Sequence, residues 1–383
     1  MRPACSQSMH SLRNGPDGAV SPTNLFAIMY NRRASSGRIL GLDWLRGIAA
    51  LWVVLYHLNI TIQKAKYFDA PSMGTFAETG YRGVELFFVL SGFVMAASTP
   101  TDARNDWGGL RRFLIRRVFR IFPAYLCIFL ALYAVALITG QGKPDNSDIG
   151  ATFFLQNLFL VPRDDLTTFM PVVSWTLTHE LMFYAAFSLV FIRLYVGVGF
   201  LLLWAAICLV AWSVGVEIDG WFMQLNVLNA YFIIGVTAFH LSKKVKPNTL
   251  FLSIFSTLML AAAISTEGKL IDFGTSNVMV TALLYATGFT SLVIASSSVT
   301  FDGSGLVRNC LNFLGRHSFG IYLVHYPIIV IFAIILSKVG FSWPALGMMV
   351  TAVPVTLCVA WVVYKLVEAP FINLARHITT GKG

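Results

Sequence analysis

Long apolar runs separated by short polar connections dominate the sequence from about residue 39 onward. A membrane-spanning helix needs about 20 mostly apolar residues, and ten segments meet that requirement. They cover residues 40–62, 82–99, 118–140, 173–193, 197–216, 222–241, 248–265, 276–297, 317–337 and 344–367. These runs are too long for strands, and only helices or closed barrels can span a bilayer. The pattern therefore predicts an all-α, polytopic transmembrane helix bundle of about ten spans.

The two ends of the chain break this pattern. Residues 1–38 are polar, rich in Ser, Arg, Asn and Pro, and lack an apolar core long enough for a cleavable signal peptide. We expect a disordered cytosolic tail over 1–38, a transmembrane domain over 39–373 and a cytosolic tail over 374–383. The apolar stretch 149–161 is too short to cross, so we expect it to be interfacial or re-entrant.

Composition and charge sharpen this prediction. Hydrophobic residues make up 56% of the chain and charged residues only 12%, whereas soluble domains carry about 25% charged residues. With the N-terminus inside, 21 of the 28 Lys and Arg residues fall on the cytosolic side. The positive-inside rule therefore explains the net charge of +10 and predicts that both termini are cytosolic, with no nucleic-acid partner. The five cysteines are widely spaced, so we expect neither a disulfide framework nor a metal site.

Ionisable residues inside the predicted spans are the candidates for chemistry, because each costs about 2.5–3.5 kcal/mol on insertion scales. The first span contains Arg46 and, eleven residues later, His57. On a helix the two are about 20° apart around the axis and about 16 Å apart along it. Asp43 precedes Arg46 by three residues and could pair with it. Each residue alone fits a snorkelling anchor or a satisfied core imidazole, but together on one face they favour a functional pair.

That pair suits acyl transfer to a hydroxyl. A neutral imidazole can take the proton of an alcohol as its oxygen attacks a thioester, and a cation can stabilise the charge that develops on the carbonyl oxygen or bind donor phosphates. After the second span, the sequence RRFLIRRVFRIFPAY places Arg112, Arg116, Arg117 and Arg120 in a predicted cytosolic loop. Clustered guanidiniums bind phosphate well. Simple anchoring to anionic lipid explains them equally well.

Polar residues in four other spans leave two interpretations open. Glu85 and Ser91 lie in the second span, His179 and Glu180 in the fourth, His325 in the ninth, and Glu368 at the cytosolic end of the tenth. Small and polar residues also join helices within membranes. A structural hydrogen bond is therefore as compatible with each position as catalysis, unless His57, Glu180 and His325 meet in one cavity.

Five blocks, in order, resemble the acyltransferase 3 family of membrane O-acyltransferases over about residues 39–373. They are the Arg46 to His57 spacing, GVELFFVLSGF, FLIRRVFRIFPAY, WTLTHELMFY and YLVHYP. The resemblance implies a bundle of about ten spans, acetyl-CoA or another acyl-CoA as co-substrate, and a carbohydrate, lipid-linked glycan or small hydroxylated acceptor. It also implies an integral protein of the bacterial inner membrane, in contact with membrane lipids.

The site residues expected from the motifs and the resemblance fall into three groups. His57, Arg46 and Glu180 are expected to be catalytic, with His57 as the general base. The expected cofactor-binding residues are Arg112, Arg116, Arg117 and Arg120. Expected substrate or supporting residues are Asp43, Glu85, Ser91, Trp175, Tyr322 and His325.

Two other classes of function stay open at this point. Buried His and Glu residues could serve the proton relay of a transporter or a flippase, which predicts proton-coupled flux without acyl-CoA turnover. A membrane scaffold is the third possibility, but it leaves the buried charges unexplained.

Overall fold

The computed structural model describes residues 39–99, 106–140, 149–163, 165–216, 225–244, 248–267, 274–299 and 305–380. The predicted N-terminal tail over 1–38 lies outside these ranges. Within them every regular element is a helix, which confirms the all-α prediction. These apolar segments are helical because a backbone in lipid must satisfy its hydrogen bonds within the segment.

The long helices follow the predicted spans closely. They are α2 (Leu40–Ile62), α4 (Gly83–Ser98), α5 (Trp107–Thr139), α7 (Trp175–Ile192), α8 (Leu194–Ser213), α9 (Leu228–Lys244), α10 (Thr249–Glu267), α11 (Gly274–Ser298), α12 (Leu306–Val339) and α13 (Pro344–Val363). In the described part of the chain, nine helical segments are long and apolar enough to cross a membrane. The remaining predicted span, over 222–241, corresponds to α9. This helix has only 17 residues and begins at Leu228, six residues later than predicted.

Short elements connect the long helices. They are α3 (Thr75–Glu78), η1 (Thr79–Arg82), α6 (Ala151–Leu158), η2 (Leu166–Thr168), η3 (Val172–Ser174), η6 (Tyr364–Glu368) and α14 (Ala369–Thr380). Helix α6 has eight residues and falls within the stretch that was predicted to be too short to cross.

The arginine block belongs to a helix rather than to the loop predicted from the sequence. Helix α5 begins at Trp107, and the Asp106 side chain caps it by accepting a hydrogen bond of 2.7 Å from the Gly109 backbone N–H. Such a cap satisfies a donor that has no partner within the helix. Its apolar residues recur at helical spacing from Phe113 onward, so the arginine segment continues into the span without a break.

Helices α2 and α12 pack at very close range through two glycines. A Cβ on Gly47 would lie 2.7 Å from the Gly315 nitrogen, and a Cβ on Gly315 would lie 2.4 Å from the Asp43 carbonyl oxygen. Small residues allow this approach of two membrane helices. The same device joins α4 to α9, where a Cβ on Gly92 would lie 1.8 Å from the Phe232 carbonyl oxygen.

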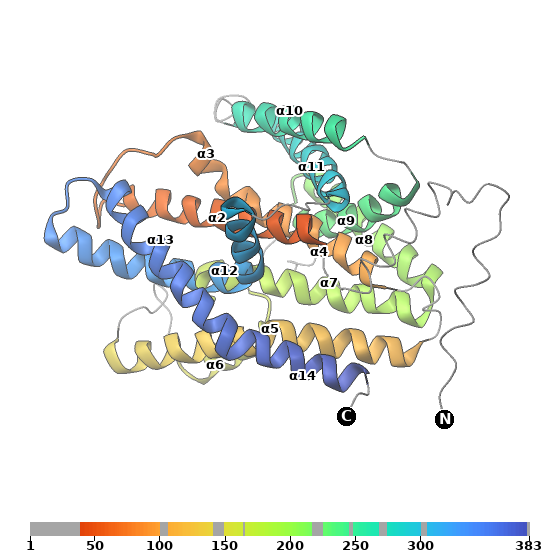
Figure 1. Ribbon diagram of the computed structural model, residues 1–383, viewed down its shortest axis with the longest axis horizontal. Coiled ribbons are helices and arrows are strands. Elements are labelled where there is room, and N and C mark those ends of the chain that lie inside the picture. Colours follow the sequence, from red (N-terminus) through yellow and green to blue (C-terminus); the bar gives the residue numbers. More distant parts are fainter. Residues whose placement is uncertain are drawn as a thin grey trace. The chain divides into compact units, whose positions relative to one another are not determined.

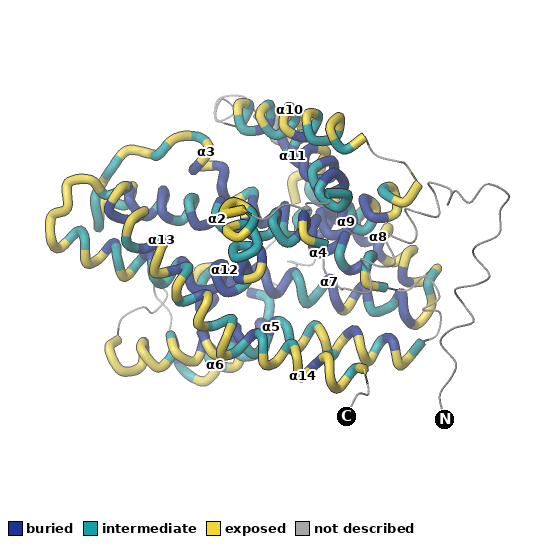
Figure 2. The backbone as a smooth tube through the Cα atoms, viewed as in Figure 1, coloured by how far each residue is buried: buried dark blue, intermediate teal, exposed yellow. Residues whose placement is uncertain are grey.

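Helices α2, α4, α7 and α9 are the most buried part of the bundle, whereas α10 is its most exposed span (Figure 2). In an apolar stretch of 18 residues, 72% of the residues are buried for the segment that contains α4, against 11% for α10. Helix α10 packs mainly against α11, and the two form a hairpin at one edge of the bundle (Figure 1). Four polar residues of α2 and α4 are buried inside the protein: Asn59, Thr61, Glu85 and Ser91.

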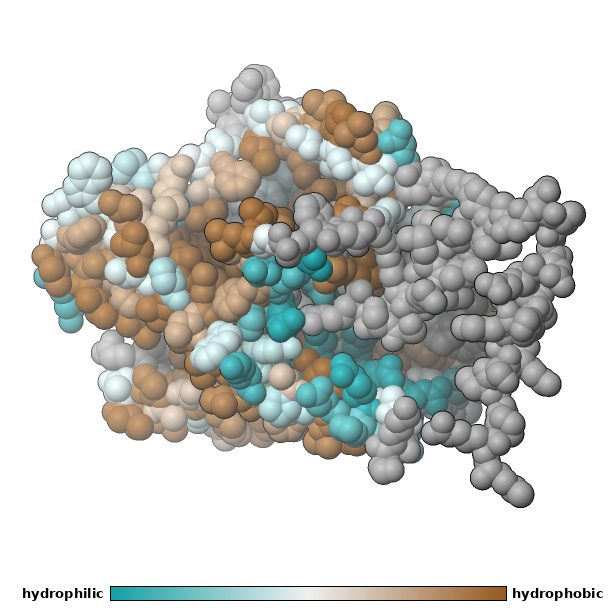
Figure 3. Space-filling model, viewed as in Figure 1, coloured by the Kyte–Doolittle hydropathy of each residue, from teal (hydrophilic) through white to brown (hydrophobic). Residues whose placement is uncertain are grey.

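The C-terminal segment is helical rather than an extended tail. Helix α13 continues through the single π-turn η6 into α14, which lies alongside α5 (Figure 1) and accepts a 3.0 Å hydrogen bond from Arg116 to Thr379. The predicted tail over 374–383 is thus helical as far as Thr380, and residues 381–383 lie outside the described ranges. Figure 3 shows hydrophilic residues gathered over α14 and the start of α5, and hydrophobic residues over much of α13. The exposed basic residues there include Arg111, Arg112, Arg116 and Arg376.

Candidate functional site

Two histidines from separate spans meet inside the bundle. His57 of α2 and His325 of α12 lie 3.2 Å apart between His57 Nδ1 and His325 Nε2, with ring centroids 4.9 Å apart. The close packing of α2 on α12 at the two glycines brings them within reach of each other. The structure therefore brings together two residues that the sequence had placed 268 positions apart.

Backbone carbonyls determine which ring nitrogen carries the proton on each histidine. His325 Nδ1 lies 3.2 Å from the Ile321 carbonyl oxygen and His57 Nδ1 lies 3.0 Å from the Val53 carbonyl oxygen. A carbonyl oxygen only accepts, so each neutral ring must donate from Nδ1. This assignment makes His325 Nε2 a second acceptor for the His57 Nδ1–H, which is shared with the Val53 carbonyl oxygen. It leaves His57 Nε2 with a lone pair.

The two rings differ in exposure. His325 is completely buried, while His57 is only partly buried and contacts the rings of Tyr56 and Tyr326 at centroid distances of 5.1 and 5.2 Å. Among the described residues, no group forms a hydrogen bond with His57 Nε2. An oriented imidazole with a free lone pair is the arrangement that general-base or nucleophilic catalysis requires.

A cavity lies at the end of the bundle that carries Arg46. Its empty volume is about 590 Å³ when the open space at its mouth is included. Its lining residues come from α2, α4, α5, α7 and α12, and they are Arg46, Val84, Phe87, Phe88, Ser91, Arg120, Ile121, Thr176, Leu177, Glu180, Ser318, Phe319 and Tyr322. Five predicted site residues thus share one cavity: Arg46, Ser91, Arg120, Glu180 and Tyr322.

Positive charge in this cavity is only partly balanced. In the described part of the chain, no hydrogen bond or ion pair involves the guanidinium of Arg46 or Arg120, although the charges of Asp43 and Glu180 act on Arg46. Glu180 instead accepts hydrogen bonds from Tyr184 and, at 3.3 Å, from Ser91. Two guanidiniums that face open space beside one engaged carboxylate are suited to binding an anion.

Tyr322 separates the cavity from the histidine pair. Its ring lines the cavity beside Phe87, with centroids 5.7 Å apart, and lies 5.8 Å from the His325 ring on the other side. The Tyr322 hydroxyl donates to the Val173 carbonyl oxygen at 3.1 Å and lies 2.9 Å from the Thr176 hydroxyl. Glu180 lines the cavity, whereas His57 and His325 do not. The candidate site therefore has two neighbouring parts.

The other arginines of α5 lie outside the cavity lining. Arg112 is exposed and pairs with Asp106 at 3.0 Å, and Arg116 binds Thr379. Arg117 lies over the rings of Phe113 and Tyr184, and its Nη2 is 3.4 Å from the Ser98 hydroxyl. Donor binding by these three residues stays a prediction, whereas Arg120 is the member of the set that faces the cavity.

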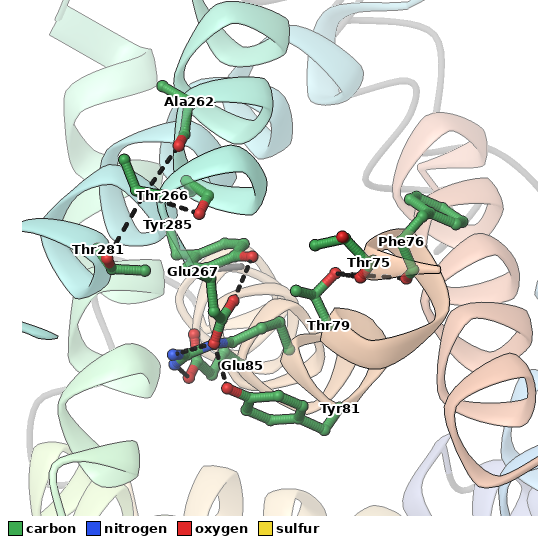
Figure 4. Close-up of polar contacts among 12 residues, drawn as sticks. Thr75, Phe76, Thr79, Tyr81, Glu85, Ala262, Thr266, Glu267, Thr281 and Tyr285 are labelled. Atoms are coloured by element: carbon green, nitrogen blue, oxygen red, sulfur yellow. Dashed lines mark hydrogen bonds and ion pairs between the residues drawn. The ribbon is translucent and has the colours of Figure 1, made fainter. Parts of the chain in front are cut away.

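Three further predicted residues have structural contacts. Asp43 packs its backbone carbonyl against Gly315, and Trp175 contacts the His179 ring at 5.7 Å. His179 is buried and its Nδ1 lies 2.9 Å from the Asn229 side-chain oxygen, so it joins two helices. Glu85 belongs to a separate network with Arg82, Tyr81 and Glu267, which Figure 4 shows.

The structure also adds residues that the sequence did not single out. Phe87, Thr176, Ser318 and Phe319 line the cavity. Ser318, Tyr322 and His325 lie at helical spacing on one face of α12, a signal already present in the sequence. Glu368, which the sequence places at the end of the tenth predicted span, is buried in the π-turn, and its charge acts on Arg120. A π-turn leaves no clear signal in a single sequence. Among the described residues, no cluster of His, Cys, Asp or Glu could hold a metal ion.

Comparisons with known proteins agree on one family. The family model described as an acyltransferase domain matches residues 39–365. The chain is 27% identical over 378 residues to the Bacillus subtilis protein named "Putative peptidoglycan O-acetyltransferase YrhL", covering 89% of this chain and 56% of that protein. It is 25% identical over 382 residues to the protein named peptidoglycan O-acetyltransferase OatA of Listeria monocytogenes, covering 89% and 58%. The chain thus spans little more than half the length of these two relatives. No solved structure matches it.

Proposed function

Since this chain belongs to the acyltransferase family whose domain model covers most of its length, we propose that it is an integral-membrane O-acyltransferase. It moves an acetyl or short acyl group from cytosolic acyl-CoA to a hydroxyl of a carbohydrate or glycoconjugate. The names of its relatives refer to peptidoglycan, a carbohydrate polymer, and this supports a sugar acceptor. The same relatives are bacterial proteins, which supports placement in the bacterial inner membrane.

One observation carries this proposal. The bond from His57 Nδ1–H to His325 Nε2, 3.2 Å long, leaves His57 Nε2 unprotonated beside two aromatic rings. In the proposed reaction this nitrogen takes the proton of the acceptor hydroxyl while the hydroxyl oxygen attacks the thioester carbonyl carbon. The carbon–sulfur bond then breaks, and the proton passes from His57 to the departing thiolate of CoA. The products are the acyl ester and free CoA.

A covalent route uses the same nitrogen. His57 Nε2 attacks the thioester carbonyl carbon, the carbon–sulfur bond breaks, and the Nδ1 proton that the acylated ring loses ends on the CoA thiolate. The acceptor hydroxyl then attacks the acyl-imidazole, and its proton returns to the ring. In both routes the ring must be neutral. Its Nε2 must point at the acceptor hydroxyl in the first route and at the thioester carbonyl carbon in the second, and His325 supports a fixed ring orientation. Trapping of radiolabel on the protein in the absence of acceptor distinguishes the two routes.

The arginine cavity supports binding of the donor. Coenzyme A carries several phosphates, and the guanidiniums of Arg46 and Arg120 offer unengaged charge at the cavity. An extended pantetheine arm of about 13 bonds spans about 15 Å at the rise per bond of an extended chain. This length is similar to the axial separation of about 16 Å between Arg46 and His57 on α2. A donor with its phosphates at the cavity therefore extends its thioester as far as His57, provided that the Tyr322 ring moves aside.

Glu180 has a supporting role in this proposal. Its carboxylate is held by Tyr184 and Ser91 and lines the cavity together with Arg46 and Arg120. One negative charge beside two positive charges leaves the cavity with a net attraction for phosphate and lowers the repulsion between the two guanidiniums.

Purified protein in lipid nanodiscs tests the proposal. We expect it to release CoA from acetyl-CoA and to transfer radiolabelled acetyl to a peptidoglycan oligosaccharide, and we expect His57→Ala to lose both reactions. Tyr195→Leu, a change of an exposed tyrosine on α8, is the matched control and keeps them. Transfer by His57→Ala at an undiminished rate contradicts both routes. Proton-coupled flux of a glycan without any CoA release supports a transporter instead.

A further inference from the structure

Two tyrosines that contact His57 have hydroxyls without a hydrogen-bond partner in the described part of the chain. Tyr56 precedes His57 on α2, and Tyr326 follows His325 on α12. Within the described ranges, no hydrogen bond involves either phenol hydroxyl, and both side chains are partly exposed. A partly buried hydroxyl without a protein partner is available to bind either water or a ligand.

Other tyrosines of this bundle behave differently. The Tyr125 hydroxyl donates to the Asn157 carbonyl oxygen at 2.6 Å, Tyr133 donates to the Ile149 carbonyl oxygen at 2.8 Å, and Tyr322 donates to Val173. Buried phenols normally find such partners. The two tyrosines beside the proposed base therefore differ from these three in their unused hydroxyls, and both contact His57.

A third tyrosine extends this surface away from His57. The Tyr81 ring lies 5.5 Å from the Tyr56 ring, so the contacts run from Tyr326 through His57 and Tyr56 to Tyr81. Tyr81 is 39% exposed, and its hydroxyl donates to Glu267. We name the rings of Tyr56, Tyr81 and Tyr326 the tyrosine surface.

An ion-pair network holds the outer end of the tyrosine surface in place. Arg82 lies 4.8 Å over the rings of both Tyr81 and Tyr285, and it pairs with Glu267 at 2.8 Å and with Glu85. Figure 4 shows Tyr81 directed toward Glu267 and Glu267 between Tyr81 and Tyr285. The network fixes the Tyr81 ring, because its hydroxyl and one of its faces are both engaged.

We propose that the tyrosine surface is the acceptor subsite, which takes a sugar ring with its apolar C–H face against the phenol rings of Tyr56 and Tyr326. The two free phenol hydroxyls bind hydroxyls of that sugar, and the ring of Tyr81 carries the neighbouring sugar of the chain. Rigid aromatic faces with a few polar groups are the usual means of binding an amphipathic ring. A sugar seated there brings a hydroxyl to His57 Nε2 from the side away from the arginine cavity. This inference rests on the proposed acyl transfer and adds the place and the orientation of its acceptor.

The test measures acceptor and donor separately. A soluble peptidoglycan oligosaccharide is the acceptor probe, and its binding to the inactive His57→Ala protein in nanodiscs is measured by calorimetry. On that background we expect Tyr56→Phe and Tyr326→Phe each to weaken binding by roughly threefold to tenfold, the loss that corresponds to one hydrogen bond. The double change to Leu removes the rings as well, and we expect it to abolish detectable binding.

Steady-state kinetics in the active protein supply the second readout. We expect Tyr56→Phe and Tyr326→Phe to raise the KM for the oligosaccharide without raising the KM for acetyl-CoA. Tyr195→Leu serves as the control and should change neither value. The phenylalanine variants keep the ring and should therefore fold. Their binding and KM values test the subsite even if the leucine variants unfold.

The outcomes separate this inference from the function on which it rests. If oligosaccharide binding and its KM stay unchanged in all the tyrosine variants while acetyl transfer proceeds, the subsite is wrong and the acyltransferase stands. A KM for acetyl-CoA that rises in parallel also overturns the subsite, because it places the tyrosines at the donor. If the unmodified protein never consumes acetyl-CoA, the proposed function itself fails.

Discussion

Helices α2 and α12 contribute to both the histidine pair and the arginine cavity. The two regions differ in whether their polar side chains have hydrogen-bond partners within the protein. In the pair, each imidazole binds a backbone carbonyl and the two rings bind each other, so that one lone pair is left over. In the cavity, the guanidiniums of Arg46 and Arg120 have no protein hydrogen bond among the described residues and face open space. The first arrangement is complete without a ligand, and the second is not.

This difference indicates how the two regions divide the reaction. Chemistry requires a group whose orientation is fixed before the substrate arrives, and the histidine pair meets that requirement. Binding of an anion requires charge that is not already paired, and the cavity supplies it. We therefore expect changes in the pair to lower kcat and changes in the cavity to raise the KM for the donor.

Loss of the base should give the largest effect. We expect His57→Ala to lower acetyl transfer by roughly 10²- to 10⁴-fold, the range for general acid–base catalysis. Binding of acetyl-CoA should change little, because the phosphates bind elsewhere. Radiolabel transfer and calorimetry on the same preparation give the two values. A large loss of acetyl-CoA binding in His57→Ala would show that the histidine pair also binds the donor, and it would contradict the division into two regions.

Loss of the orienting partner should come next. His325→Leu leaves the His57 Nδ1–H without its side-chain acceptor, and we expect kcat to fall by up to about 10²-fold, because a slightly misplaced group can cost that much. The amide oxygen of His325→Gln can accept the same hydrogen bond. Its kcat should lie clearly above that of the leucine variant. Equal kcat values for the two variants would show that His325 only fills space.

Removal of one guanidinium from the cavity should mainly affect the donor. We expect Arg46→Ala and Arg120→Ala each to raise the KM for acetyl-CoA by roughly 10- to 100-fold, because a hydrogen bond to a charged group contributes about 1.5–3 kcal/mol. Arg112→Ala is the matched control, since Arg112 is exposed and pairs with Asp106. A thermal shift with acetyl-CoA, absent with an analogue that lacks the phosphates, provides a readout independent of turnover. If all three variants raise the KM for acetyl-CoA equally, the cavity arginines bind the donor no better than the exposed Arg112, and the proposed donor site is wrong.

The smallest effect should come from the residue between the two regions. Tyr322→Phe removes the hydroxyl that binds Val173 and Thr176, and we expect a loss of stability of about 0.5–1.5 kcal/mol. A looser ring should admit water to the thioester, so hydrolysis of acetyl-CoA without acceptor should rise a few-fold. Denaturation and CoA release measure the two effects. Slower hydrolysis would argue against a role of Tyr322 as a partition.

Most of the fold could be predicted from the sequence because hydrophobic length alone defines a membrane span. The span predicted over 40–62 coincides with α2, and the others agree within a few residues except at the ends of α5, α9 and α12. Helix α5 was predicted too short because its first turns are rich in arginine, and a hydropathy criterion stops at charge. The helix continues because its amphipathic pattern and the Asp106 cap continue.

The site was predictable as a set of residues but not as an arrangement. Periodicity places Arg46 and His57 on one face of α2 and places Ser318, Tyr322 and His325 on one face of α12. The distance between the two faces depends on how closely the helices pack, which Gly47 and Gly315 decide together. A single sequence does not show which two glycines meet. For the same reason it could not separate Glu180, which faces the cavity, from His179, which binds Asn229.

The central claim is that His57 holds its lone pair on Nε2 because its Nδ1–H is engaged by Val53 and His325. Nitrogen NMR of protein labelled with ¹⁵N-histidine reports this directly, since the chain has only 7 histidines and a His57→Ala spectrum identifies the signal. We predict a neutral ring protonated at Nδ1 and unprotonated at Nε2 at neutral pH. A His57 ring protonated at Nε2 instead would contradict the account.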